Sequence, residues 1–302
     1  MPESPRGSTG PDARLVVALV AALLLGAALA PVAYDATRED GPDAAVAVVP
    51  VSGAIGSASA DATVEDLREV RRNDSVKAVV LDVNSPGGGV AASERLYLAV
   101  ARLAEEKPVV ASAGAQAASG GYYAMMPAER IYVLPSSIVG SVGAYAQTPP
   151  PFPDGVVRSG PDKASSTTQQ TRRQVEAIQE SFLDTVFEHR GDRLELTREE
   201  LAHAKVYRGT RAVSLGVADA LGTRGDAVAY AAEQAGVDSY DVYRKEPPRR
   251  GILLLQANDG GNGSTVVVRD DGLGYEEVET TQFYLLHGRV DATGEVSHNG
   301  SA

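Results

Sequence analysis

Short apolar runs alternate with amphipathic segments over the first half of the chain, and this alternation restricts its fold more than any other feature. The runs are typical of buried strands, and the segments between them have apolar residues at helical spacing, such as Val64, Leu67 and Val70. Strands are expected at residues 44–51, 76–83, 109–111 and 131–134, and helices at 63–73, 91–105 and 119–126. Strands that alternate with helices favour right-handed crossovers. The sequence therefore predicts an α/β fold with a largely parallel sheet and flanking helices.

The amino-terminal segment carries an uncharged run of 19 residues from Leu15 to Ala33. A helix of this length spans roughly 28 Å, close to the ~30 Å hydrocarbon core of a bilayer. We expect a transmembrane anchor at 15–34, preceded by a cytoplasmic segment (1–14) and followed by a linker (35–43). A cleaved signal peptide is the alternative, because Ala28-Leu-Ala30 resembles a cleavage site; a buried core helix would need a polar face. Arg6 and Arg14 precede the run, so the body of the chain is expected outside the cytoplasm.

The composition excludes several kinds of chemistry. The net charge is −12, which disfavours a nucleic-acid partner. Only five lysines stand against 23 arginines, and such an acidic, lysine-poor surface suits high salt. The chain has no cysteine and four histidines, which removes disulfides and thiolate catalysis and leaves little for a metal site. We therefore expect neither a metal nor a cofactor.

Two small-residue segments indicate where chemistry takes place. The first, Ala111–Tyr123, places Ser119 between a strand and a helix start, where free backbone N–H groups favour negative charge. The second, Asn84-Ser-Pro-Gly-Gly-Gly89, is a glycine-rich turn that follows another strand. Small neighbours allow a peptide backbone to approach the hydroxyl of Ser119. Their other interpretation is a pair of tight turns with no chemistry.

Together these segments resemble the core of the signal peptide peptidase family (peptidase family S49), membrane-anchored serine–lysine proteases related to the Clp protease and crotonase folds. The resemblance covers residues 44–240 and corresponds to the single-repeat form. It implies a Clp protease/crotonase-like peptidase domain. Residues 245–302 fall outside it, with strands expected at 251–256, 264–269 and 280–286. We interpret them as a small β-rich or partly disordered appendage without recognisable chemistry.

The resemblance also implies roles for individual residues. Ser119 would be the nucleophile and Lys163, in Arg158-Ser-Gly-Pro-Asp-Lys163, its general base. An ordinary lysine has a pKa of ~10.4, so Lys163 must be enclosed to lose its proton near neutrality. Ser141 would orient Lys163, and the N–H groups of Gly88 and Gly120 would form the oxyanion hole. For Lys163 and Ser141 an ordinary turn residue is the alternative interpretation.

The function implied is a membrane-anchored serine endopeptidase that hydrolyses residual signal peptides or other short hydrophobic peptides. Its partners would be peptide substrates, membrane lipid through the anchor, and further copies in a ring in which a neighbour can supply the lysine. One departure from the family is the compact, proline-rich bridge at 144–162, which motivates a second reading as an inactive scaffold or peptide-binding platform. A crotonase-type acyl-CoA enzyme and a Ser-His-Asp triad using His203 are weaker alternatives.

Overall fold

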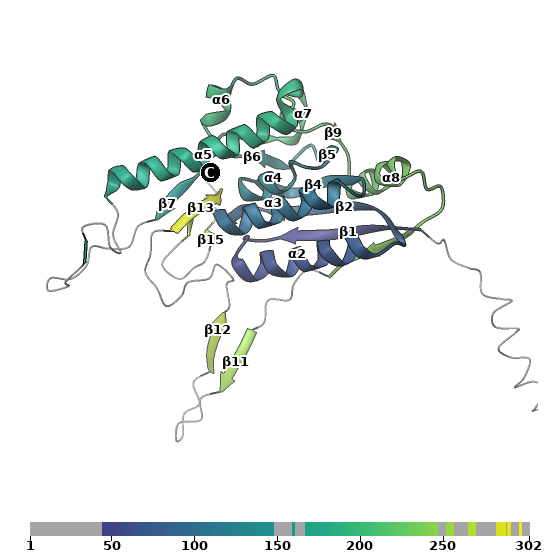
Figure 1. Cartoon of the computed structure of the whole chain (residues 1–302), viewed down its shortest axis with the longest axis horizontal. Helices are drawn as coiled ribbons and strands as arrows, with labels where there is room; N and C mark the ends of the chain where they lie inside the picture. The colour runs from purple at the N-terminus through teal and green to yellow at the C-terminus, as the bar shows by residue number, and fades with distance from the viewer. Residues whose placement is uncertain are drawn as a thin grey trace, which may run out of the picture. The chain divides into compact units, whose positions relative to one another are not determined.

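The computed structural model describes residues 44–147, 159–160, 167–246, 252–256, 265–269, 282–287, 289–290 and 296–297 (Figure 1). They belong to one compact unit, which starts at Ala44. The predicted segments 1–14, 15–34 and 35–43 lie outside the described residues. Within the described part of the chain, no helix has the length and apolarity needed to cross a membrane.

A parallel sheet forms the centre of the fold. Its strand order is β10-β1-β2-β4-β5-β9, and each neighbouring pair runs parallel. The strands are β1 (Ala45–Ser52), β2 (Val76–Ser85), β4 (Val109–Ala118), β5 (Arg130–Val133), β9 (Ala220–Leu221) and β10 (Asp241–Arg244). The predicted α/β class and parallel sheet are confirmed.

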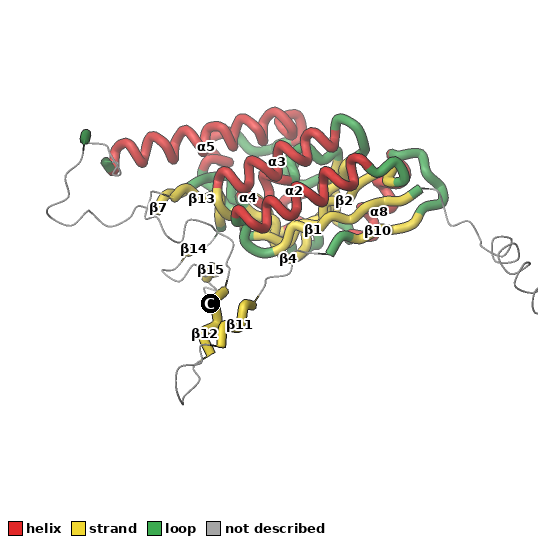
Figure 2. The backbone as a smooth tube through the Cα atoms, turned by 60° about the horizontal axis from the view of Figure 1, so that its bottom comes forward, coloured by secondary structure: helices red, strands yellow, loops and turns green. Residues whose placement is uncertain are grey.

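Helices cover both faces of this sheet (Figure 2). Helices α2 (Ser57–Arg72) and α3 (Val90–Ala104) share one apolar core with Ala47 and Val49 of β1. Helix α8 (Arg224–Gln234) forms a second core with Val46 and Val48 on the opposite face. A strand buried on both faces needs apolar residues at every position, which explains the uninterrupted run at 44–51.

The predicted helices 63–73 and 91–105 are confirmed as α2 and α3, and the predicted stripe of α2 (Val64, Leu67 and Val70) is buried. Helix α2 nevertheless begins at Ser57 rather than at the predicted Thr63. Its first turns contain small residues, and the Ser59 hydroxyl accepts a hydrogen bond from the Gly56 N–H at 3.0 Å. Small residues carry little hydropathy signal, so the periodicity does not reveal these turns.

Strand β4 is much longer than the predicted 109–111 and belongs to two ladders in succession. Its first half pairs with β5, and its second half, Gln116–Ala118, pairs in parallel with β6 (Ile138–Gly140). Between these halves β4 bulges against β2, where the Asn84 Oδ1 atom accepts a hydrogen bond from the Gln116 N–H at 3.2 Å. The second half of β4 stays in the same sheet and carries the chain directly to Ser119.

The remaining elements complete the described part of the chain. Strand β8 pairs antiparallel with β6. The predicted helix 119–126 corresponds to α4, and the predicted tail strands correspond to β11, β12 and β13. The bounds are β3 (Gly87–Gly89), α4 (Gly120–Ala124), β7 (Tyr145–Gln147), α5 (Thr168–Arg190), a 3₁₀ turn (Gly191–Arg193), α6 (Arg198–Ala202), β8 (Val206–Arg208), α7 (Gly209–Ser214), β11 (Ile252–Gln256), β12 (Thr265–Arg269), β13 (Gln282–Leu286), β14 (Arg289–Val290) and β15 (Val296–Ser297).

A buried ion pair fixes the carboxyl end of α5. The Arg190 side chain, 1% exposed, binds both carboxylate oxygens of Asp219 and donates from Nε to the Gly216 carbonyl at 3.0 Å. Asp219 also accepts a hydrogen bond from the Ile131 N–H of β5 at 2.7 Å. Arg193 contacts the same carboxylate at 3.2 Å but is half exposed.

We expect Arg190→Met to lower the free energy of unfolding by about 3 kcal/mol, because it leaves a poorly solvated carboxylate without its main partner. The matched change Arg193→Met removes an exposed contact with the same carboxylate and is expected to cost less than about 1 kcal/mol. Urea denaturation of the two variants checks this, and equal losses would contradict it.

Candidate active site

Ser119 occupies a sharp turn between β4 and α4. Its backbone has φ 52° and ψ −118°, a conformation that residues other than glycine rarely adopt. The Ser119 N–H donates to the Gly140 carbonyl at 2.8 Å, and the Tyr123 N–H donates to the Ser119 carbonyl at 2.8 Å. The residue is fully buried. Such a turn, held from both sides, is the geometry that presents a nucleophilic serine at the end of a strand.

The β4–β6 ladder brings Ser141 beside this turn. Ala118 pairs with Gly140, so each serine follows one member of the last pair in the ladder. Ser141 also has a positive φ of 57°, and its N–H donates to the Lys205 carbonyl at 2.8 Å. Its hydroxyl lies 3.3 Å from Nδ1 of His287. The structure thus places together two serines that lie far apart in the sequence.

The glycine-rich turn forms the short strand β3, whose two edges contact different segments of the chain. The Gly87 carbonyl accepts a hydrogen bond from the Ile55 N–H, and the Gly89 N–H donates to the Ile55 carbonyl, both at 2.9 Å. Because backbone groups alternate along a strand, the Gly88 N–H faces the opposite edge, toward β13. A Cβ atom on Gly88 would lie 2.0 Å from the Ile55 oxygen, so the position requires glycine.

The backbone of Gly120 lies close to Gly87 of β3. A Cβ atom on Gly87, whose φ is 98°, would lie 2.7 Å from the Gly120 nitrogen and 2.0 Å from the Leu285 carbonyl oxygen. The two predicted oxyanion-hole residues, Gly88 and Gly120, therefore border the same small space next to Ser119. A carbonyl oxygen of β13 already lies there.

Two buried serines that the sequence analysis did not single out hold β3 in place. The Ser85 hydroxyl donates to the Gly53 carbonyl at 2.6 Å and accepts from the Gly87 N–H at 3.1 Å. The Ser93 hydroxyl donates to the Gly89 carbonyl at 2.9 Å. The sequence signal that could have identified Ser85 and Ser93 is their position beside the Pro-Gly-Gly-Gly turn.

Helix α4 is fixed behind Ser119 by two tyrosines. The Tyr122 hydroxyl donates to the Val217 carbonyl at 2.8 Å, and burial raises the pKa of Tyr122 to about 12, which keeps this donor protonated. Tyr123 packs against Tyr97 and Phe182, with ring centroids 4.8 Å apart in each pair. The rigid surroundings of α4 support the strained turn that precedes it.

The predicted base, Lys163, lies outside the described residues. Two described lysines have other partners: Lys107 donates to the Val70 and Asn73 carbonyls, and Lys245 binds Glu69. Lys77 and Lys205 are exposed. The hydrogen bond of the Ser119 hydroxyl within the described part of the chain goes to the Gly143 carbonyl at 3.4 Å. Among the same residues no acidic or histidine cluster suited to a metal ion is found.

Strand β13 comes from the predicted appendage 245–302, yet it is part of the site. It pairs antiparallel with β3 on one edge and with β7 on the other. The sequence analysis predicted this strand but attached no chemistry to it. Its apolar run Tyr284-Leu-Leu286 was the only signal, and hydropathy does not reveal which strand edges a segment joins.

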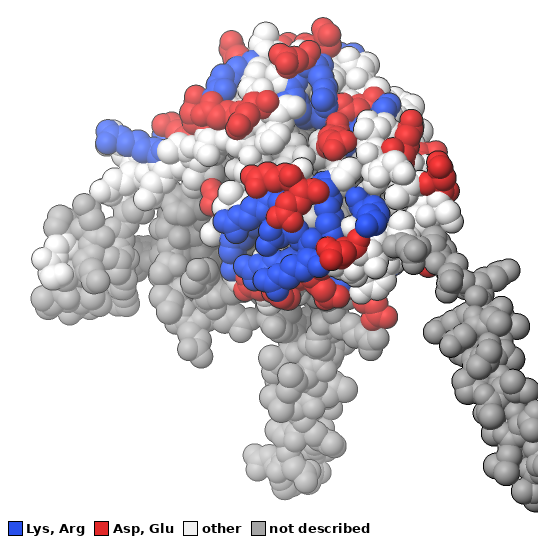
Figure 3. All heavy atoms as spheres, turned by 45° about the vertical axis from the view of Figure 1, so that its right-hand side comes forward, with Lys and Arg blue, Asp and Glu red and all other residues white. Residues whose placement is uncertain are grey.

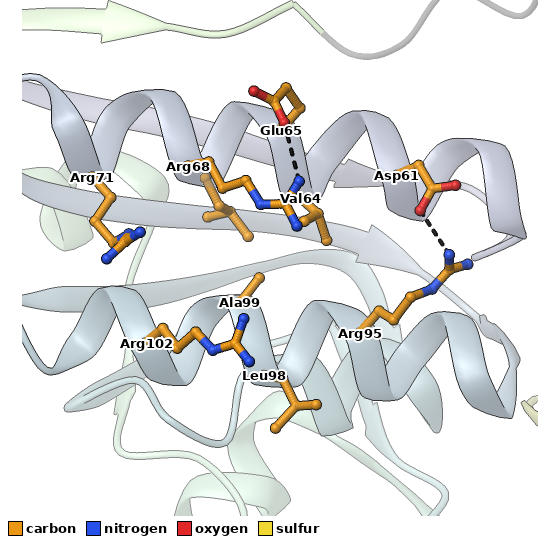
Figure 4. Close-up of a pocket in the computed structure, with 10 residues that line it drawn as sticks. Asp61, Val64, Glu65, Arg68, Arg71, Arg95, Leu98, Ala99 and Arg102 are labelled. Atoms are coloured by element: carbon orange, nitrogen blue, oxygen red, sulfur yellow. Dashed lines mark hydrogen bonds and ion pairs between the residues drawn. The ribbon is translucent and has the colours of Figure 1, made fainter.

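A separate hollow of about 430 Å³ lies between α2 and α3. Side chains from both helices point into it (Figure 4), and its basic residues contribute to a positive patch edged by carboxylates (Figure 3). Arg68 pairs with Glu65 and Arg95 pairs with Asp61. The lining residues are Asp61, Val64, Glu65, Leu67, Arg68, Arg71, Arg95, Leu98, Ala99 and Arg102. None of them is a predicted site residue.

Comparison with known proteins identifies the class. The profile of peptidase family S49 matches residues 101–150 and 158–238, a stretch that contains Ser119, Ser141 and Lys163. Protease 4 of Salmonella typhi is 36% identical over 229 residues, covering 67% of this chain and 37% of that protein. Two proteins named as putative proteases are also similar: one of Methanocaldococcus jannaschii (34% identical, 58% of this chain and 62% of that protein) and one of Synechocystis (30% identical, 77% and 88%). The chain belongs to peptidase family S49.

The glycine strand supplies a sharp test of the site. We expect Gly88→Ala to slow labelling of Ser119 by a fluorophosphonate about 100-fold, because the added methyl must displace the Ile55 carbonyl and with it the Gly88 N–H. Gly89→Ala is the matched control, since its Cβ would meet its nearest neighbour at 3.9 Å. Labelling rates measured beside thermal melting check this; equal rates in the two variants would contradict it.

Proposed function

We propose that this chain is a serine endopeptidase in which Ser119 is the nucleophile and Lys163 the general base. The N–H groups of Gly88 and Gly120 stabilise the oxyanion, and Ser141 orients the lysine. The strained Ser119 turn beside two glycine N–H groups is the observation that carries this proposal. Membership of family S49 supports it and implies peptide substrates.

The chemistry requires an unprotonated amine. Neutral Lys163 takes the proton of the Ser119 hydroxyl as the oxygen attacks the peptide carbonyl, and the resulting oxyanion is held by two backbone N–H groups. Collapse of this intermediate breaks the C–N bond, and the leaving amine takes the proton from Lys163. A water molecule then hydrolyses the acyl-enzyme by the same route. The apolar, buried surroundings of Ser119 favour the neutral form of an amine enclosed there.

The finer features rest on the family resemblance and the sequence. Residues 15–34 anchor the protein in the cell membrane, and the catalytic domain, with its Clp protease/crotonase-like fold, lies outside the cytoplasm. The substrates are residual signal peptides or other short hydrophobic peptides released at the membrane. Copies assemble into a ring, in which Lys163 reaches the Ser119 of the same chain or of a neighbour.

We expect Ser119→Ala and Lys163→Ala each to lower kcat/KM for an apolar peptide by about 1,000-fold or more, because either change removes a partner of one proton transfer. Lys205→Ala, at an exposed lysine, is the matched control and should keep its activity. Hydrolysis of a fluorogenic peptide and labelling by a fluorophosphonate measure the effect.

A fold control accompanies this experiment, because alanine at position 119 retains the strained φ of 52°. Glycine relieves that strain, so Ser119→Gly should be inactive but more stable than Ser119→Ala, by about 1 kcal/mol. Wild-type-like turnover by any of the Ser119 or Lys163 variants would overturn the proposed dyad. A wild-type protein that binds the peptide but neither hydrolyses it nor reacts with the fluorophosphonate would favour the inactive peptide-binding platform.

A further inference from the structure

The hollow between α2 and α3 is rich in arginine. Four arginines and two carboxylates line it, which leaves two positive charges in a chain whose net charge is −12. Its volume of about 430 Å³ is typical of a small-molecule site. Figure 3 shows basic side chains gathered on this face of the molecule. A local excess of positive charge on an acidic protein attracts anions to this hollow.

The arginines near the carboxyl ends of the two helices are the most available to a ligand. The other two pair with the carboxylates of the lining. Arg71 pairs with Glu106, and both side chains are largely exposed, at 32% and 49%. Such a pair contributes little to stability and is readily exchanged for another anion. Within the described part of the chain, Arg102 forms no ion pair.

Apolar side chains lie between the arginines. Val64 and Leu67 line the hollow from α2 and are buried, whereas Leu98 of α3 is 49% exposed (Figure 4). Arginine binds phosphate oxygens through paired N–H groups, and apolar side chains favour contact with hydrocarbon. The lining therefore matches a phosphate group that is attached to a short apolar body.

The available arginines lie near the point where the chain enters the fold. The Ala45 N–H of β1 donates to the Ser75 carbonyl at 2.7 Å, just after the end of α2. The Lys107 ammonium, just after α3, donates to the Asn73 carbonyl at 2.7 Å. Residues 35–43 join this point to the proposed anchor, and an extended chain of that length spans at most about 30 Å. A bilayer that holds the anchor is therefore within reach of the hollow.

We propose that the α2–α3 hollow binds the headgroup of an anionic phospholipid in the membrane that carries the anchor. This inference rests on the proposed function, because it requires the anchor at 15–34. Arg71 and Arg102 donate to the phosphate oxygens, and Leu98 contacts the carbon atoms beside the headgroup. Phosphatidylglycerol has the required chemistry, whereas phosphatidylcholine carries a compensating positive charge.

The hollow extends away from the catalytic end of the sheet. Helix α2 follows the carboxyl end of β1 and returns to the amino end of β2, so Arg71 in its last turn lies near the amino edge of the sheet. Ser119 follows the carboxyl end of β4. Headgroup binding therefore orients the domain on the bilayer and leaves the serine site uncovered. Loss of the arginines should leave turnover of a soluble peptide unchanged.

One introduced cysteine can report whether the hollow lies near a bilayer, because the chain has no other cysteine. Ala101→Cys lies beside Arg102 on α3, and Gln234→Cys is the control on α8, which covers the opposite face of the sheet. Each full-length variant carries one fluorophore in vesicles that contain a headgroup quencher. Phosphatidylglycerol mixed equally with phosphatidylcholine should increase quenching at position 101 only. Equal responses at the two positions would overturn the inference.

Two charge-matched double variants test the arginines. Arg71→Gln with Arg102→Gln should raise the concentration of a short-chain phosphatidylglycerol needed for half-saturation at least about tenfold, followed by the Ala101→Cys fluorophore in detergent. Arg172→Gln with Arg173→Gln removes the same charge from exposed positions of α5 and should change it little. Equal shifts in the two variants would contradict the inference. Saturation by inorganic phosphate at the same concentration would overturn the assignment to a lipid.

Flotation with vesicles of phosphatidylcholine alone separates this inference from the proposed function. Wild-type protein that does not float would overturn the proposed anchor. Protein that floats, but whose hollow does not respond to phosphatidylglycerol, would overturn only the lipid site. A double variant of Arg71 and Arg102 that alters self-association and leaves phosphatidylglycerol binding intact would assign the hollow to a contact between copies, and so would also overturn it.

Discussion

The double ladder of β4 is the constraint on which the site depends. Because one strand pairs first with β5 and then with β6, it extends beyond β5 and ends next to Ser119. The same pairing brings Ser141 to its side. The strained backbone at Ser119 persists because hydrogen bonds from β6 and α4 hold it on both sides. A single pattern of backbone pairing thus determines both where the hydroxyl lies and how it is presented.

Close approach of backbones explains the glycines around this hydroxyl. Gly88 lies against the Ile55 carbonyl and Gly87 against the Gly120 nitrogen, at separations that leave no room for a Cβ atom. Peptide groups line this space together with the Ser93 hydroxyl, and its backbone N–H donors need no side-chain reorganisation. Fixed donors of this kind stabilise a developing negative charge most effectively, because they are oriented before the reaction begins.

The carboxyl-terminal strand contributes a backbone carbonyl to this space. Strand β13 joins β3 and β7, which lie on segments distant from it in the sequence, and places the Leu285 carbonyl among the glycines. The main sheet of the fold is complete without β13.

The sequence by itself determined the α/β class, the apolar stripes of α2 and α3, and the two turns that carry Ser119 and Gly88, because periodicity and small-residue patterns are local properties. The roles assigned to these residues came from family resemblance. Only the tertiary structure decided the full extent of β4, the meeting of Ser119 with Ser141, and the docking of β13. These features depend on which strand edges pair across the chain, and backbone hydrogen bonds form with little regard to side-chain identity, so no local pattern encodes them.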